Sequence, residues 1–365
     1  MRGRGGYGRR SAVAISLSTR VPAPPHPCRT FREPPTVPRV KAFSSVLIFA
    51  LSLACTAALL SRVLPPVTVP QFTEKIAWFA AHKDDYDAVF LGSSQFYHGI
   101  DPQQFDRDAG LGKRSFNFGL DGLWPAESFF VLRQILAQHS RRLRWVFIDW
   151  MDIDPRIDPA GTTRRMMCWH DTQHTIITLQ HIAEMPDTWL NKAQLAGPHF
   201  RLWMRRFVNH GRAVEWFEGK LRKNNYGRVV KTPSWTKQDG WRPGAPNGID
   251  GEALTEYTTQ LEYLRNAGAR PAMGAAFESA LRDIAAEVRT GGATPILIAS
   301  PAADTRQRFA ASPGIEAWIF NDPGLYPELF DPDLRYDIYH LNPRGAELFS
   351  RLLAERFAES QKPRP

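Results

Sequence analysis

Cysteine is scarce in this sequence, with three residues among 365. Cys28 lies in an Arg- and Pro-rich N-terminal stretch and Cys55 in a long apolar run, so Cys168 stands alone in the rest of the chain. This count excludes an intrachain disulfide and a cysteine-based metal cluster in that part. The chain also lacks a phosphate-binding loop, a zinc-ligand spacing and a dinucleotide fingerprint. We therefore expect neither a cofactor nor a metal.

An excess of positive charge is also lacking over most of the chain, although the formal net charge is +9. Residues 1–41 contain nine basic residues against one acidic residue, Glu33, and so carry +8 of that +9. The nine are Arg2, Arg4, Arg9, Arg10, Arg20, Arg29, Arg32, Arg39 and Lys41. Because the rest of the chain is nearly neutral, it lacks the basic excess that binds nucleic acid, and we expect no nucleic-acid partner.

The N-terminal segments predict a membrane anchor. Residues 1–41 have too few apolar side chains to fold on their own, and we expect a disordered cytoplasmic tail. The twenty residues Ala42 to Ser61 carry no charge and predict a transmembrane helix over 42–64, since a helix rises about 1.5 Å per residue and the hydrocarbon core is about 30 Å thick. Positive charge stays on the cytoplasmic side, so we expect residues 66–365 outside, in the periplasm of a single-pass inner-membrane protein.

A cleaved signal peptide is the closest alternative to this anchor. The run Ser52-Leu53-Ala54-Cys55 weakly resembles a bacterial lipoprotein cleavage site. However, the apolar run continues past Cys55, which favours a membrane-spanning helix.

Short apolar runs alternate with amphipathic stretches over residues 66–365. Strands are predicted at 87–91, 114–118, 144–150 and 295–299, and helices at 125–139, 275–289 and 345–358. This alternation predicts an α/β fold, a flavodoxin-like parallel sheet covered by helices on both faces in three layers, α/β/α. Residues 156–270 interrupt the alternation and hold six tryptophans, and we interpret them as an inserted helical cap.

Two serines, Ser93 and Ser94, follow directly after the first predicted strand, where an open parallel sheet places its functional residues. A serine hydroxyl needs a neighbouring base, and that base must itself be oriented. Near the other end of the chain, Asp337 precedes His340 by three residues, a spacing at which the carboxylate can reach the imidazole. The pattern predicts Ser94 as nucleophile, His340 as base and Asp337 as the group that orients it. The structural alternatives are a turn serine, a surface histidine and a helix-capping aspartate.

The motifs Gly92-Ser93-Ser94 and Asp337-x-x-His340 resemble the first and last blocks of the SGNH (GDSL-like) hydrolase and acyltransferase superfamily. The resemblance covers about residues 85–150 and 275–358. It implies that the nucleophile is Ser94, with Ser93 replacing the usual aspartate. The family's second block is similar to the segment from Asn117 to Gly122, which implies an oxyanion hole formed by the N–H groups of Ser94 and Gly122, with Gly119 as the second choice for the glycine.

One block departs from the family pattern. The third block, Gly-x-Asn-Asp, should follow the third strand, but Asp149, Trp150, Met151 and Asp152 stand there without an asparagine. The missing asparagine donates to the oxyanion in the family, and loss of one such donor costs about a hundredfold or more in rate. This departure keeps a non-catalytic hypothesis open beside the enzymatic one.

The resemblance implies a serine esterase or O-acyltransferase that acts on carbohydrate O-esters, and membrane anchoring suggests a role in cell-surface polysaccharide modification. The expected partners are an ester substrate, the inner membrane and a membrane-bound acyltransferase. The alternative is a catalytically silent SGNH-like protein that binds polysaccharide or serves as a scaffold for a membrane acyltransferase. Because a fold does not determine a substrate, both functions stay open at this point.

Overall fold

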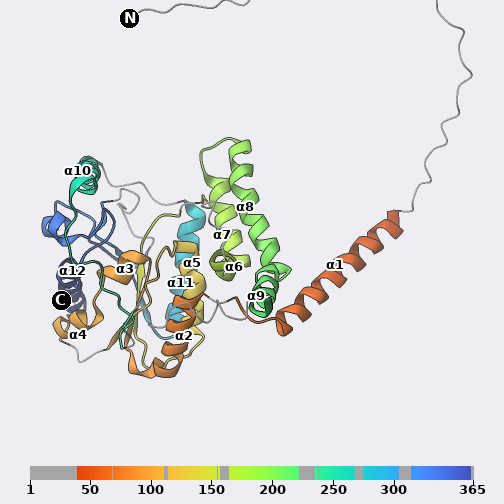
Figure 1. Cartoon of the computed structure of the whole chain (residues 1–365), viewed down its shortest axis with the longest axis horizontal. Coiled ribbons are helices and arrows are strands. Elements are labelled where there is room, and N and C mark those ends of the chain that lie inside the picture. Colours follow the sequence, from red (N-terminus) through yellow and green to blue (C-terminus); the bar gives the residue numbers. More distant parts are fainter. Residues whose placement is uncertain are drawn as a thin grey trace, which may run out of the picture. The chain divides into compact units, whose positions relative to one another are not determined.

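A computed structural model describes residues 39–67, 69–110, 114–153, 155–156, 164–221, 235–236, 238–267, 274–303 and 314–362. The chain divides into two compact units, residues 1–53 and 54–365. Of the tail predicted at 1–41, residues 1–38 lie outside the described part of the chain. Figure 1 shows the helices and strands, with colours that follow the sequence.

The predicted apolar helix near the N-terminus is present as α1 (Arg39–Val63). Its segment Phe43–Val63 is long and apolar enough to cross a membrane, because 21 residues at about 1.5 Å each match a hydrocarbon core of about 30 Å. Large apolar side chains along this helix, such as Phe43 and Phe49, are exposed. Such exposure is costly in water and favourable in lipid.

The described part of the chain contains a five-stranded parallel sheet with the order β2-β1-β3-β4-β5. The strands are β1 (Ala88–Leu91), β2 (Ser115–Asn117), β3 (Trp145–Asp149), β4 (Thr294–Ala299) and β5 (Glu316–Ile319). The first four confirm the predicted strands, and the parallel sheet with its helices confirms the α/β class. Strand β5 was not predicted because it is short and only its third residue is buried, which leaves a weak apolar signal.

Helices occupy most of the remaining described residues (Figure 1). The three predicted helices are present as α5 (Pro125–Leu136), α11 (Ala275–Thr290) and α12 (Pro343–Ser360). The other α-helices are α2 (Pro70–His82), α3 (Ser94–Gly99), α4 (Pro102–Asp108), α6 (Arg164–Trp169), α7 (Thr172–Glu184), α8 (Trp189–Phe207), α9 (His210–Leu221) and α10 (Gly251–Asn266). Single 3₁₀ turns are η1 (Lys83–Asp85), η5 (Pro327–Phe330) and η6 (Pro332–Leu334).

Two apolar clusters form the core, and the strands contribute to both. Val89 and Leu91 of β1 belong to the first cluster, whereas Ala88 and Phe90 belong to the second. Successive side chains of a strand point to opposite faces, so a strand buried on both faces consists of apolar residues throughout. Helices α2, α5 and α11 contribute to the first cluster, and α4, α10 and α12 to the second.

The segment 156–270, interpreted as an inserted cap, contains the helices α6 to α10, whereas its described residues 238–250 form turns and irregular backbone. Its helix α7 packs against α5 and α11, and α7 also packs against α8. By contrast, α10 contributes Tyr257, Leu261 and Leu264 to the second cluster. The segment therefore contacts both core clusters, through different helices.

Candidate active site

Ser94 lies at the carboxyl end of β1, where the chain turns into α3. Ser93 is the N-cap of this helix, and its Oγ accepts a hydrogen bond from the N–H of Gln95 at 3.2 Å. Ser94 is the first helical residue, so its N–H has no carbonyl partner within α3. The turn itself requires glycine at position 92, because a Cβ there would lie 2.6 Å from the Cβ of Asp149.

Asp149, at the end of β3, holds this turn in place. Its Oδ2 accepts hydrogen bonds from the Ser93 hydroxyl at 2.6 Å and from the Ser93 N–H at 3.0 Å. The carboxyl group is fully buried, and burial raises its pKa to about 6, although hydrogen bonds from Ser93 and Ser300 act in the opposite direction. Asp149 therefore anchors the residue next to Ser94 through two charge-assisted hydrogen bonds above this pH.

Asp337 and His340 lie in the loop that leads into α12. The side chain of Asn342 caps this helix by accepting from the N–H of Gly345 at 3.0 Å. Upstream, the buried guanidinium of Arg335 donates to the carbonyl oxygens of Leu329 and Pro301. The loop is thus tied down on both sides of the Asp337–His340 pair, and α12 then packs into the second core cluster.

The structure brings Ser94, His340 and Asp337 together from opposite ends of the chain. The Nε2 atom of His340 lies 2.7 Å from the Oγ of Ser94, and its Nδ1 atom lies 2.8 Å from Oδ2 of Asp337. With a proton on Nδ1 donated to the carboxylate, Nε2 is free to accept the proton of the serine hydroxyl. These distances match the arrangement of nucleophile, base and orienting acid that activates a serine.

Electrostatics keep Asp337 ionised. Burial raises its pKa, but the hydrogen bonds and charge of His340 and the N–H groups of Tyr339 and His340 outweigh burial, so the pKa of Asp337 is lowered. Both N–H groups donate to Oδ1 at 2.8 Å. The Asp337 side chain is 39 % exposed and that of His340 18 %. A carboxylate in this position stabilises an imidazolium, with partial screening by water.

The two glycines predicted for the oxyanion hole differ in their surroundings. The N–H of Gly119 donates to Oδ1 of Asn117 at 2.7 Å, so this donor is already engaged. Gly122 has a positive φ of 60°, a conformation that glycine adopts without strain, and it lines the same pocket as Ser94 and His340. Of the two positions, only Gly122 therefore adjoins the pocket in the described residues.

A pocket of about 290 Å³ opens over the catalytic candidates. Its lining comprises Ser93, Ser94, Gln95, Gly122, Leu123, Trp124, Met151, Tyr339 and His340. None of the described residues of segment 156–270 is among them, so the predicted cap does not line this pocket. Met151 stands in the region of the third family block, and Gln95 is the one side-chain amide in the described lining. A larger cavity of about 700 Å³, lined by residues such as Phe72 and Trp203, contains neither Ser94 nor His340.

Lys75 of α2 holds the segment that leads to Gly122, a role that was not predicted from the sequence. This fully buried side chain donates from Nζ to the carbonyl oxygens of Asn117 at 2.8 Å and Gly119 at 2.7 Å. Burial lowers its pKa well below the usual range, although the charges of Asp121 and Asp239 act in the opposite direction. No local spacing announces Lys75, because its partners lie more than 40 positions away.

Other polar residues near the site have structural partners. His98, which follows Ser94 by four positions, pairs through Nε2 with Asp121 at 3.1 Å and through Nδ1 with the carbonyl of Arg242 at 3.0 Å. Asp152 does not line the pocket, and Asp154 lies outside the described residues. His98 therefore ties two loops together and contacts the ring of His340, with centroids 5.6 Å apart, but it does not line the pocket.

A second cluster of polar side chains was not predicted from the sequence. His170, His174 and His199 are all buried, and their ligand nitrogens lie within 4.8 Å of one another. Two of the three are four positions apart, His170-x-x-x-His174, which is a spacing that could have indicated the pair. The expectation of no metal overlooked this spacing.

No protein-family model matches the chain, and a search of curated proteins found no match either. The chemistry of the site therefore rests on its geometry. A serine hydroxyl within 2.7 Å of an imidazole that is itself held by a carboxylate can form an acyl-serine ester. The open pocket gives a carbonyl compound access to it.

Proposed function

We propose that the protein is a membrane-anchored serine esterase or O-acyltransferase of the SGNH type. The observation that carries this proposal is the Ser94–His340–Asp337 arrangement, with hydrogen-bonding distances of 2.7 and 2.8 Å, at the wall of an open pocket. The two core clusters agree with the three-layer α/β/α arrangement of that superfamily. Along the chain, Ser94 comes first, then the turn at Gly122 and last the Asp337–His340 pair, which is the order of the superfamily's motifs.

The proposed reaction begins when the Oγ of Ser94 attacks the carbonyl carbon of an ester and its proton passes to Nε2 of His340. Asp337 stabilises the imidazolium that results. The N–H groups of Ser94 and Gly122 donate to the negatively charged carbonyl oxygen of the tetrahedral intermediate. When this intermediate collapses, the bond to the leaving alcohol breaks, and His340 returns the proton to that alcohol, leaving an acyl-Ser94 ester.

The second half of the reaction transfers the acyl group. Water or a sugar hydroxyl gives its proton to Nε2 of His340 and attacks the acyl-serine carbonyl carbon. When this second intermediate collapses, the bond to Oγ of Ser94 breaks and His340 returns the proton to Oγ, which restores the hydroxyl. Water as the acceptor makes the protein an esterase, and a sugar hydroxyl makes it an O-acyltransferase. We propose carbohydrate O-esters as the substrate class, on the resemblance of the motifs.

The proposed location is the bacterial inner membrane, with residues 66–365 in the periplasm. The apolar helix Phe43–Val63 is the anchor. Nine basic residues in 1–41 favour a cytoplasmic N-terminus. At the outer surface, cell-surface polysaccharide is the accessible carbohydrate, and a membrane-bound acyltransferase is the proposed partner that supplies or uses acyl groups.

Hydrolysis of p-nitrophenyl acetate by the full-length protein in detergent tests the proposal. The wild-type protein should release p-nitrophenol, and Ser94→Ala should reduce the rate about a hundredfold or more. Ser279→Ala, at an exposed position of α11, is the matched control and should retain full activity. Wild-type activity that survives Ser94→Ala would refute the assignment of Ser94.

A second candidate function rests on the third block, where Met151 lines the pocket and the family asparagine is missing. A site with too few oxyanion donors would bind polysaccharide or act as a scaffold for a membrane acyltransferase without catalysis. This candidate predicts no hydrolysis by the wild-type protein and unchanged binding of acetylated polysaccharide by Ser94→Ala.

A further inference from the structure

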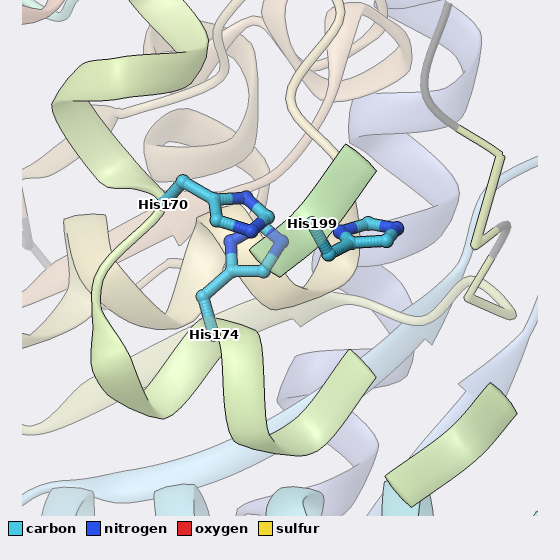
Figure 2. Close-up of side chains that lie close together, drawn as sticks. All are labelled: His170, His174 and His199. Carbon is cyan, nitrogen blue, oxygen red and sulfur yellow. The ribbon is translucent and has the colours of Figure 1, made fainter. Parts of the chain in front are cut away.

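The cluster of His170, His174 and His199 lies in the helical segment beside α5, apart from the Ser94 pocket. His170 follows the end of α6, His174 lies in the first turn of α7, and His199 lies in the middle of α8. Figure 2 shows the three imidazole rings gathered between these helices. The ring centroids of His170 and His174 are 4.1 Å apart, and those of His170 and His199 are 5.1 Å apart.

We propose that His170, His174 and His199 form a binding site for a divalent transition-metal ion, with zinc as the expected ion. Three imidazoles are a common donor set for zinc, which keeps a fourth position for water or another ligand. Imidazole also suits copper and nickel, whereas calcium and magnesium require oxygen ligands.

The hydrogen bonding of the rings favours metal binding. Nε2 of His199 lies 2.7 Å from the carbonyl oxygen of Pro155 and donates its proton there, which leaves the lone pair of Nδ1 available. This Nδ1 atom is buried without a hydrogen-bond partner. Histidines that bind metals characteristically donate their other ring nitrogen to a backbone carbonyl or a carboxylate in this way.

The other two rings also present unused nitrogens. Nδ1 of His174 and both ring nitrogens of His170 are buried and have no hydrogen-bond partner within 3.5 Å, although the backbone of Trp169 and of His199 is close enough to raise the pKa values of His174 and His170, respectively. Buried polar atoms are paired in the great majority of cases. Four such nitrogens lie in three neighbouring rings. One ligand shared by the three rings explains them better than three unrelated departures from the rule that buried polar atoms are hydrogen-bonded.

The charge state of the rings fits the same ligand. Burial lowers the pKa of His170 to about 3 and also lowers the pKa values of His174 and His199, with the charge of Arg206 acting in the same direction on His170 and His174. Burial thus favours the neutral form of imidazole, which is the form that coordinates a metal.

The surrounding charges include both signs. The positive charge of Arg206 disfavours a cation nearby. The carboxylate of Asp171 interacts favourably with Arg206 and raises its pKa, so it offsets part of this positive charge. A small cavity of about 40 Å³ adjoins His174 and His199 and is lined by the buried carboxyl residue Glu127 and by Arg156. Since this cavity has room for a water molecule, it offers a fourth ligand.

The geometry requires only a small adjustment. Zinc–nitrogen bonds of about 2.0–2.1 Å place tetrahedral ligands about 3.4 Å apart. The ligand nitrogens lie within 4.8 Å of one another. Ring rotations that move them by about an ångström are sufficient, and they remain within the range of ordinary side-chain rotamers. The metal would then connect α6, α7 and α8, which are also joined by hydrogen bonds from Trp203 to Thr172 and from Arg206 to the carbonyl of Met167.

Metal content of the full-length protein tests the proposal. The protein is purified without a polyhistidine tag, stripped with a chelator, incubated with zinc chloride and dialysed, and zinc is then measured by mass spectrometry. The expected result is about one zinc ion per chain. His199→Gln and His174→Gln should reduce this content about tenfold or more, whereas His210→Ala, at an exposed position of α9, should leave it unchanged.

Cobalt provides a second measurement that does not depend on the stability of the variants. Cobalt added to the stripped wild-type protein should produce the visible absorption of a tetrahedral site, and one equivalent of zinc should abolish it. Wild-type protein that retains no zinc and shows no such absorption overturns the proposal, as does full zinc binding by folded His199→Gln and His174→Gln. Since metal content is the readout, these outcomes are independent of the esterase assay.

Discussion

Replacement of Asp337 by asparagine should inactivate the protein through the tautomer of His340. Oδ1 of Asp337 accepts from the N–H groups of Tyr339 and His340, both at 2.8 Å. Nδ1 of His340 lies 2.8 Å from Oδ2 and 2.9 Å from Oδ1. An asparagine must keep its carbonyl oxygen on the two backbone donors, so its NH₂ group takes the nearer position of Oδ2 and donates to Nδ1. Nδ1 then accepts, Nε2 carries the proton, and His340 can no longer accept the proton of Ser94.

The expected loss is large because the substitution changes the direction of a hydrogen bond rather than removing one. The corresponding exchange in a serine protease triad lowers kcat about ten thousandfold, which is about 5.5 kcal/mol in the activation free energy. The Asp337 side chain is 39 % exposed, so water screens part of its interaction with His340. We therefore expect kcat to fall by at least about a thousandfold.

The assay is the initial rate of p-nitrophenyl acetate hydrolysis by full-length Asp337→Asn in detergent. Asp283→Asn, at an exposed position of α11, is the matched control for the loss of one negative charge. The two variants and the wild-type protein should unfold at similar temperatures, because the asparagine retains both backbone hydrogen bonds. A rate for Asp337→Asn within about tenfold of the wild-type rate would refute the role of Asp337.

Three further predictions concern the surroundings of Ser94. The pKa of Asp149 is about 6 in the folded protein against about 3.9 when unfolded, so the folded state binds this proton more tightly and the stability of the wild-type protein falls as the pH rises from about 4 to 7. The free energy of unfolding of Asp149→Asn should therefore increase by up to about 3 kcal/mol relative to that of the wild type over this range. Thermal unfolding temperatures whose difference does not grow with pH would contradict this prediction. Gly92→Ala should lower the unfolding temperature by several degrees, since its Cβ would meet Asp149 at 2.6 Å, whereas Gly197→Ala, with open space around it, should not. Gln95→Ala should lower kcat about a hundredfold or more with little change in KM if its amide, which lines the pocket, supplies the oxyanion donor that the third block lacks. Equal kcat values would exclude that role.

Much of the local structure was predictable because it depends on neighbouring residues. Ala88 to Leu91 is apolar throughout, and this pattern specifies a strand buried on both faces. The spacing of Asp337 and His340 places both groups in one loop, so their contact was also predictable. Strand β5 was not, because its residues are half exposed and its position at the sheet edge depends on β4.

The partners that lie far apart in the sequence are a property of the fold. Ser94 and His340 are 246 positions apart, and their contact depends on the packing of α12, which follows His340, against α3, which begins at Ser94. Asp149 looked like a mismatch to a family motif, yet it binds Ser93 because β3 is the neighbour of β1. Lys75 has no local signal of any kind.

The sequence by itself determined the long apolar helix near the N-terminus, the strand–helix alternation and the identity of the three triad candidates, since each follows from residues close together in the chain. The tertiary structure alone decided that Gly122 rather than Gly119 adjoins the pocket, because hydrogen bonding to Asn117 engages the Gly119 donor. It also decided that His199 joins His170 and His174. Helix packing sets that distance, and no spacing within the sequence encodes it.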